Sequence, residues 1–269
     1  MHAPGRLRAR RPWLPIIGAA LAVAIVCALG AWRPWIVPSA PVAADDEAAV
    51  AITPAALVLP DEPRVLVFGD SWVYGSAAIV PTLGFAYRLG DDLGWETVVD
   101  GVRGSGYLKP GLDGGSYPER VAALDPALDP DLIIVEGSIN DRRLPAAGYR
   151  DAVTEVWDAL VSLYPDAAIV ILGPSPQVLP VEAATSRIDA DLAALAAARG
   201  WWYISPIAEG WIREANYLDV IDTGPVGRDH PSTAGHAYLA ERVAEALHGM
   251  TEATDVVADA PLDEELVAP

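Results

Sequence analysis

The feature that most constrains the fold is an alternation, between residues 64 and 247, of short apolar runs with longer segments of helical periodicity. The runs predict five strands: Arg64–Phe68, Glu96–Val99, Asp131–Val135, Ala167–Leu172 and Trp201–Ile204. The longer segments predict helices over Leu83–Leu93, Gly148–Leu163, Glu182–Arg199 and Ser232–Leu247. Strands and helices in this order form a parallel sheet with helices on both faces. The sequence therefore predicts a three-layer α/β/α domain.

Polar residues follow two of the predicted strands, where parallel sheets bind their ligands. The first strand is followed by Gly69-Asp70-Ser71, and the third is followed a few residues later by Asn140. Both segments also fit ordinary turns, which glycine, asparagine and aspartate favour. The chemical interpretation makes Ser71 a nucleophile and the Asn140 amide a donor to a developing oxyanion.

Two further segments complete the set of candidates. Gly104 belongs to a glycine-rich stretch, residues 101–106, whose backbone N–H groups can face a ligand. The spacing of the glycines in this stretch fits neither a P-loop nor a dinucleotide-binding fingerprint. His230 precedes the last predicted helix, where it is well placed to act as a base, whereas His236 falls within that helix and is expected to be structural.

The order Gly-Asp-Ser, glycine-rich loop, Asn140-Asp141 and His230-Pro231 resembles the SGNH (GDSL) hydrolase family over about residues 64–248. The resemblance implies a flavodoxin-like fold with a five-stranded parallel sheet and no metal or organic cofactor. It also implies that Ser71 is the nucleophile and His230 the general base. The implied oxyanion hole consists of the backbone N–H groups of Ser71 and Gly104 and the side chain of Asn140, with Gly106 as the alternative to Gly104.

The histidine block departs from the family pattern. Family members usually have an aspartate three residues before the histidine, and Gly227 stands at that position here. A general base needs its second ring nitrogen held in place. Three partners remain open for His230: the carboxylate of Asp222, the carboxylate of Asp229, or a backbone carbonyl of the loop.

The N-terminal segment predicts export. Four arginines, at positions 6, 8, 10 and 11, precede an uncharged run over Pro12–Trp32 that is long enough to span a bilayer. Arginines remain on the cytoplasmic side. We expect a cytoplasmic tail over 1–11, a membrane anchor over 12–36 and a Pro/Ala/acidic linker over 37–63. The hydrolase domain, 64–249, then lies outside the cytoplasm, followed by an acidic disordered tail, 250–269. A signal peptide cleaved near Ala44, giving a secreted protein, is the alternative.

Charge and composition narrow the function. The formal net charge of −19 argues against nucleic acid as a partner. The single cysteine, Cys27, lies in the apolar run, so the predicted domain has no disulfide and no cysteine metal site. We expect an extracytoplasmic serine esterase that cleaves a short acyl group from a glycan or small molecule. The alternatives are a surface-glycan O-acyltransferase and a catalytically silent glycan-binding module of the same fold.

Overall fold

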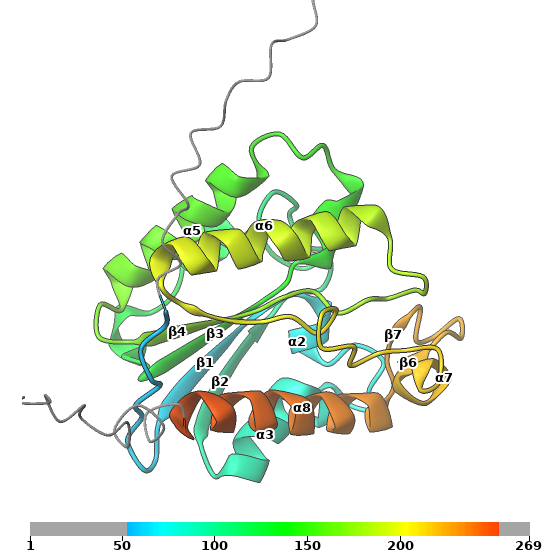
Figure 1. Ribbon diagram of the computed structural model, residues 1–269, viewed down its shortest axis with the longest axis horizontal. Coiled ribbons are helices and arrows are strands. Elements are labelled where there is room, and N and C mark those ends of the chain that lie inside the picture. The colour runs from blue at the N-terminus through cyan, green and yellow to red at the C-terminus, as the bar shows by residue number, and fades with distance from the viewer. Residues whose placement is uncertain (1–52, 253–269) are drawn as a thin grey trace, which may run out of the picture. The chain divides into compact units, whose positions relative to one another are not determined.

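The computed structural model describes residues 53–252, and a five-stranded parallel sheet lies at the centre of this range (Figure 1). Its strands are β1 (Arg64–Gly69), β2 (Glu96–Gly101), β3 (Leu132–Glu136), β4 (Ala168–Leu172) and β5 (Trp202–Ile204). The strand order is β2-β1-β3-β4-β5, and every neighbouring pair is parallel. The predicted parallel sheet is confirmed, and each strand begins and ends within two residues of the prediction.

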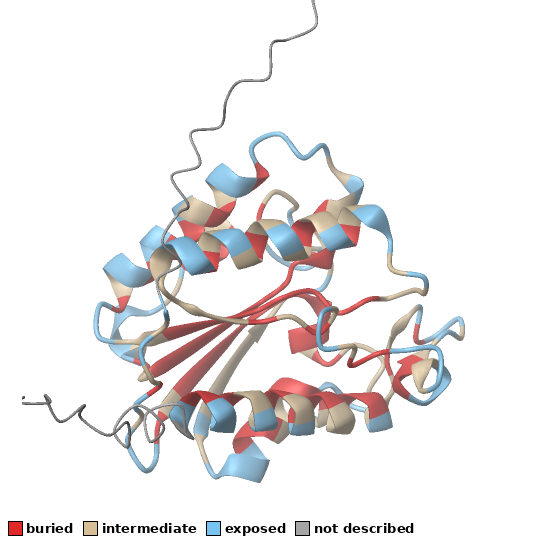
Figure 2. Cartoon of the chain, viewed as in Figure 1, coloured by how far each residue is buried: buried red, intermediate tan, exposed pale blue. Residues whose placement is uncertain are grey.

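Helices cover both faces of the sheet. Helices α3 (Phe85–Leu93) and α8 (Thr233–Glu252) lie on one face, and α5 (Tyr149–Leu163) and α6 (Ala183–Arg199) lie on the other (Figure 1). The side chains of β1 show how the sequence builds two cores. Val65 and Val67 pack with the α3–α8 layer, while Leu66 and Phe68 pack with the α5–α6 layer. Successive strand residues point to opposite faces, so an apolar run buries both. Figure 2 shows the resulting buried interior.

The domain extends beyond both predicted boundaries. Leu57 is buried in the core, and its N–H donates to the carbonyl of Met250 at 3.2 Å. The Trp202 indole N–H donates to the carbonyl of Ala55 at 2.7 Å. Helix α8 continues to Glu252 instead of ending at Leu247. The last part of the predicted linker therefore packs on the domain, because Leu57 removes apolar surface from water there.

Several short elements went unpredicted. They are the helices α2 (Ser71–Tyr74), α4 (Tyr117–Val121) and α7 (Tyr217–Val220), the 3₁₀ turns η1 (Pro81–Leu83), η2 (Pro126–Leu128) and η3 (Ile139–Arg143), and the strands β6 (Ile221–Asp222) and β7 (His230–Pro231). Elements of two to five residues are too short to show a hydrophobic period.

The predicted membrane segment, 12–36, lies outside the described residues, as does most of the predicted acidic tail. Within residues 53–252, no helix combines the length and apolar character needed to cross a bilayer.

Candidate active site

Ser71 stands where β1 turns into α2 at the carboxyl edge of the sheet. The turn requires a glycine at position 69, because a Cβ there would lie 2.5 Å from Val73 Cγ2 and 2.7 Å from Glu136 Oε2. Asp70 caps the short helix, since its Oδ1 accepts the Trp72 N–H at 2.9 Å. The cap and the tight turn fix the backbone on both sides of Ser71.

A two-stranded antiparallel sheet brings His230 to this serine. Strand β7 pairs with β6, with His230 opposite Asp222, and closes the loop between them. His230 Nε2 lies 2.9 Å from Ser71 Oγ, although the two residues are 159 positions apart. The two predicted catalytic side chains are therefore in hydrogen-bonding contact.

Backbone carbonyls hold the other ring nitrogen of His230. Its Nδ1 lies 2.9 Å from the oxygen of Gly227 and 3.0 Å from that of Arg228. A carbonyl oxygen only accepts hydrogen bonds, so Nδ1 must carry the proton in the neutral ring. Nε2 is then the unprotonated nitrogen that faces the Ser71 hydroxyl, which is the tautomer a general base requires.

Neither candidate carboxylate takes this place. Asp222 Oδ1 accepts the Gly224 N–H at 2.8 Å, and within residues 53–252 the imidazole makes no hydrogen bond to Asp222 or Asp229. A Cβ at position 227 would lie 2.2 Å from Asp222 Cγ, so Asp222 fills the space a side chain would need there. The sequence left three candidate partners for His230 Nδ1, and the geometry supports the third, a backbone carbonyl of the loop.

The loop adopts an unusual backbone to present these carbonyls. Arg228 and Asp229 have φ angles of 50° and 61°, in the left-handed region that non-glycine residues rarely adopt. The fold holds them there through backbone bonds from the Arg228 N–H to Gly224 O at 2.8 Å and from the Asp229 N–H to Asp222 O at 3.0 Å. A strained conformation of this kind persists only where surrounding contacts enforce it.

The four residues predicted to act together line one cavity of about 470 Å³. Ser71, Gly104, Asn140 and His230 all contribute to its wall. Gly104 has a φ of 74°, which a glycine adopts without strain. The structure therefore brings the predicted nucleophile, base and oxyanion donors to one place.

Asn140 has more partners than the sequence suggested. Its Nδ2 donates to Asp70 Oδ2 at 2.8 Å and to Ser105 O at 3.0 Å. Its backbone N–H donates to Ser138 Oγ at 3.0 Å, at the start of η3. The side chain thus ties the serine turn to the glycine-rich loop in addition to lining the cavity. To stabilise an oxyanion, the amide would have to share one of these two bonds with the substrate.

Asp141 holds the glycine-rich loop from the inside. Its carboxylate accepts the backbone N–H groups of Tyr107, Leu108 and Lys109 at 2.8–3.1 Å. Burial raises the pKa of Asp141 to about 6, and the three N–H donors oppose that rise. Its adjacency to Asn140 was the only sequence signal for this role.

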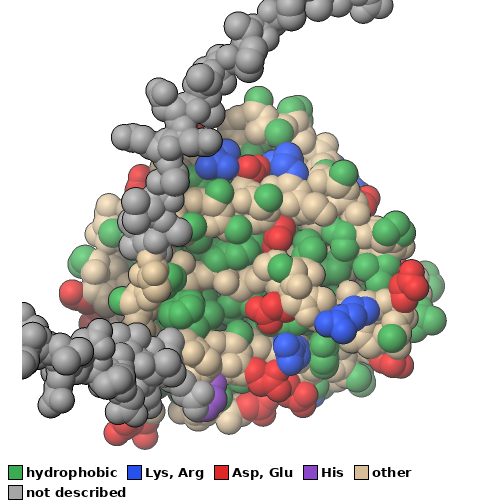
Figure 3. Space-filling view, in the orientation of Figure 1, with side chains coloured by type: hydrophobic (Ala, Val, Ile, Leu, Met, Phe, Trp, Pro, Cys, Tyr) green, Lys and Arg blue, Asp and Glu red, His purple; other side chains and the backbone are tan. Residues whose placement is uncertain are grey.

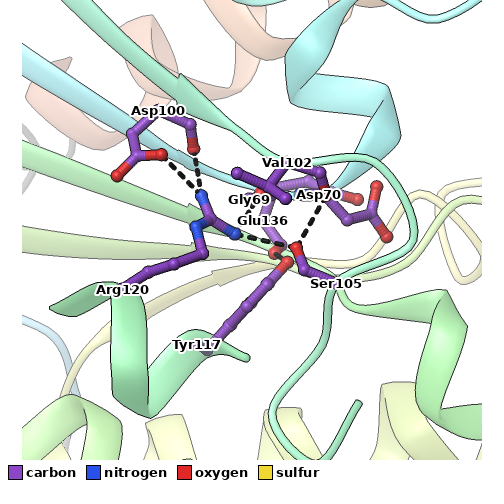
Figure 4. A network of polar contacts seen from close by, with 8 residues as sticks. All are labelled: Gly69, Asp70, Asp100, Val102, Ser105, Tyr117, Arg120 and Glu136. Carbon is purple, nitrogen blue, oxygen red and sulfur yellow. Dashed lines mark hydrogen bonds and ion pairs between the residues drawn. The ribbon is translucent and has the colours of Figure 1, made fainter. Parts of the chain in front are cut away.

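Arg120, which the sequence analysis missed, links the ends of β1 and β2 to the same loop (Figure 4). Its Nη1 donates to Gly69 O and Ser105 Oγ, both at 2.8 Å. Its Nη2 donates to Asp100 O at 2.6 Å and to Asp100 Oδ1 at 2.8 Å. The guanidinium carbon also lies 4.1 Å from the centre of the Phe68 ring. No local pattern marks such a residue, because its partners are distant in sequence.

Two buried carboxyl groups lie behind the serine. Burial raises the pKa of both Asp70 and Glu136, and their mutual repulsion adds to the rise for Glu136. The positive charge of Arg120 acts in the opposite direction on both groups. The nearby guanidinium therefore partly offsets the effect of burial on Asp70, the acceptor of the Asn140 amide, whose pKa remains raised.

Comparisons with known proteins give the family. Residues 67–238, more than half of the chain, match the model of the GDSL-like lipase/acylhydrolase family. A GDSL lipase of Mycobacterium tuberculosis is 29% identical over 147 residues, which cover 52% of this chain. The match spans 59% of that relative's length.

Solved structures share the fold at low sequence identity. The aryl esterase of M. smegmatis has a TM-score of 0.55 at 17% identity, covering 70% of this chain and 99% of its own. A carbohydrate acetylesterase family member from Sinorhizobium meliloti has a TM-score of 0.54 at 13% identity, with coverages of 70% and 99%. A two-domain esterase active on acetylated mannans has a TM-score of 0.56 at 17% identity, with coverages of 77% and 53%. The chain belongs to the GDSL-like lipase/acylhydrolase family, also called the SGNH hydrolases.

Proposed function

We propose that this protein is a serine esterase in which Ser71 is the nucleophile and His230 the general base. The observation that carries the proposal is the 2.9 Å contact between Ser71 Oγ and His230 Nε2 in the wall of an open cavity. A serine hydroxyl needs an adjacent base to become an effective nucleophile. The two carbonyls on Nδ1 prepare His230 for that role without a carboxylate.

The acyl group is transferred twice, first to Ser71 and then to water. Ser71 Oγ attacks the ester carbonyl carbon while its proton passes to His230 Nε2. The tetrahedral intermediate collapses, the C–O bond to the alcohol breaks, and His230 returns the proton to the departing oxygen. Water then attacks the acyl-serine, again losing a proton to His230, and the acid is released with Ser71 restored.

The oxyanion is stabilised by the backbone N–H groups of Ser71 and Gly104 and by the amide of Asn140. A donor of this kind typically contributes about 3–4 kcal/mol to the transition state. Because Asn140 already donates to Asp70 and Ser105, its contribution combines positioning of the loop with a bond to the oxyanion.

The substrate is a carboxylic ester with a short acyl group, carried on a glycan or small molecule outside the cytoplasm. The activity of one structural relative on acetylated mannans supports this choice. The arginine cluster and the uncharged run after it support export, with membrane attachment through residues 12–36 or secretion after cleavage.

Covalent labelling tests the proposal. A fluorophosphonate transfers its phosphorus to an activated serine with loss of fluoride, and peptide mass spectrometry locates the adduct. We expect one adduct, on Ser71, that forms much more slowly in the His230→Ala protein. Ser116, which hydrogen-bonds to Glu119, serves as the internal control. An adduct on another serine, or equal labelling of the His230→Ala protein, would contradict the assignment.

A further inference from the structure

The cavity around Ser71 carries a charge opposite to that of the whole chain. The protein has 37 acidic and 18 basic residues, which give a formal net charge of −19. Yet the residues that line the cavity include five basic ones, Arg103, Lys109, Arg142, Arg143 and Arg228, and no aspartate or glutamate. On the face that Figure 3 shows, by contrast, acidic and basic side chains are mixed.

Three of the five cations are not neutralised by an ion pair. Arg103 pairs with Asp113, and Arg142 pairs with Glu182 at 2.6 Å and donates to Gln177 at 2.8 Å. Within residues 53–252, Lys109, Arg143 and Arg228 form no such pair. Because Arg103 and Arg142 are paired with carboxylates, the unpaired positive charge of the cavity wall lies on these three side chains.

Lys109 lies beside Gly104, a member of the proposed oxyanion hole. Its Nζ lies 3.5 Å from the point where a Cβ on Gly104 would stand. Its backbone is fixed, since its N–H donates to Asp141 Oδ1 at 3.1 Å. It is also the only lysine in the chain. The one ammonium side chain of this protein therefore lies beside Gly104.

The other two free cations come from the segments that carry the remaining candidates. Arg143 ends η3, three residues after Asn140, and Arg228 supplies one of the carbonyls that hold His230. Arg228 keeps its long side chain even though its φ of 50° favours glycine or asparagine. Three separate loops therefore place a cation around the Ser71–His230 pair.

We infer that the preferred substrate is an ester bearing a negatively charged group, a carboxylate, phosphate or sulfate, close to the scissile bond. This inference rests on the proposed esterase function and adds the charge of its substrate. Lys109, Arg143 and Arg228 bind the anion, and their field also concentrates anionic esters at the mouth of the cavity. Because these side chains reach solvent, salt weakens the preference.

Matched ester pairs test the inference and show which part of the ester carries the charge. The first pair is 4-acetoxybenzoate and its neutral amide, which differ in charge on the alcohol side. The second is the mono-4-nitrophenyl ester of adipic acid and its neutral methyl ester, which differ on the acyl side. We expect kcat/KM to favour the anionic member about tenfold or more in at least one pair, and 0.5 M salt to reduce the ratio.

Charge-removing variants assign the effect to the cavity. The triple variant Lys109→Met, Arg143→Gln, Arg228→Gln should bring the ratio close to one. The control is Arg64→Gln, which removes a cation at the first residue of β1, the opposite end of the strand from Ser71. It should leave the ratio unchanged. A ratio near one in the native protein for both pairs, or a high ratio that persists in the triple variant, would overturn the inference.

Binding to the Ser71→Ala protein separates this inference from the proposed function. Calorimetry should show that this protein binds 4-acetoxybenzoate more tightly than the amide, and that the three charge removals abolish the difference. If no ester is hydrolysed, the esterase proposal fails, and the binding difference alone decides the inference. Equal binding of the acid and the amide would then refute it.

Discussion

At the scale of single residues, the proposed catalysis depends on how His230 is held. Serine hydrolases usually orient the histidine with a carboxylate, whose loss costs up to about 10⁴ in kcat. Here the oxygens of Gly227 and Arg228 occupy Nδ1, and Asp222 is engaged with the Gly224 N–H. A carbonyl fixes the tautomer, and it does so without adding a full negative charge beside the imidazolium.

We therefore expect Asp222→Asn and Asp229→Asn each to lower kcat by less than about tenfold, because neither carboxylate contacts the imidazole. Asparagine retains an acceptor for the Gly224 N–H and tolerates the left-handed backbone at position 229. His230→Ala, measured beside them, should abolish turnover. A loss approaching 10⁴ in either asparagine variant would identify that carboxylate as the orienting group.

The sequence could not have predicted this arrangement residue by residue. Gly227 marked a missing aspartate, but nothing local showed that Asp222 fills the space beside it. The candidates Ser71, Gly104, Asn140 and His230 were found because each belongs to a short motif at a strand end. Arg120 and Lys109 belong to no motif, and only the folded chain shows what they contact.

At the scale of elements, Arg120 holds the catalytic edge of the sheet together. It joins the ends of β1 and β2 to Ser105, with a side chain only 7% exposed. Replacing it removes a charge that offsets Asp70 and Glu136. It also removes the donor to Ser105 Oγ and one of the two donors to Gly69 O, which accepts the Val102 N–H as well.

Arg120→Met should lower the free energy of unfolding by up to about 3–5 kcal/mol, the cost of breaking a fully buried ion pair, because Arg120 is buried while its partner Asp100 is 29% exposed. Arg150→Met is the matched control, because its pair with Asp191 is half exposed and should contribute about 0–1 kcal/mol. Urea unfolding followed by circular dichroism measures both. Equal effects of the two substitutions would contradict the role given to Arg120.

His236 couples the packing of α8 to pH. Its Nδ1 accepts the Phe85 N–H at 3.2 Å, and Nε2 lies 3.0 Å from Ser76 O, to which it donates. Burial lowers the pKa of His236 from 6.5 to about 4. Between these values the unfolded chain binds the proton and the folded chain does not, so stability falls as pH falls from about 6.5 to about 4.

As the pH falls over this whole range, the neutral buried His236 lowers the free energy of unfolding by about 3 kcal/mol. His236→Gln should remove this contribution, so the difference in unfolding free energy between the native and variant proteins should shrink as the pH falls through that window. The raised pKa of Asp141 acts in the opposite direction in both proteins and cancels in the comparison. A difference that does not change between pH 7 and pH 4 would be inconsistent with a neutral buried His236.

Elements differed in how well the sequence predicted them, and length explains the difference. The strand β3 is a continuous apolar run with every residue buried, and the helix α5 shows a clear apolar period. The four-residue helix that carries Ser71 and the two-residue strand that carries His230 show none. Tertiary contacts define these short elements, and the catalytic side chains stand on them.

At the scale of the whole molecule, the fold and family follow from the order of strands and motifs, whereas location depends on residues outside the described range. We expect alkaline phosphatase fused to the C-terminus to be active in cells, because the arginine cluster stays inside and the domain crosses the membrane. Deleting residues 12–36 should abolish that activity.

The intact mass of the exported protein then distinguishes an uncleaved anchor from a signal peptide cut near Ala44. A native fusion found inactive and soluble in the cytoplasm would contradict both forms of export.

The most direct test of the central claim is kcat/KM for 4-nitrophenyl acetate in the native, Ser71→Ala and His230→Ala proteins, each shown to be folded by circular dichroism. Loss of either member of a nucleophile–base pair removes the same activated oxygen, so both substitutions should lower kcat/KM by at least about 10³. For the same reason, the double variant should be no worse than either single one. A Ser71→Ala protein that retains more than a tenth of the native activity would contradict the account.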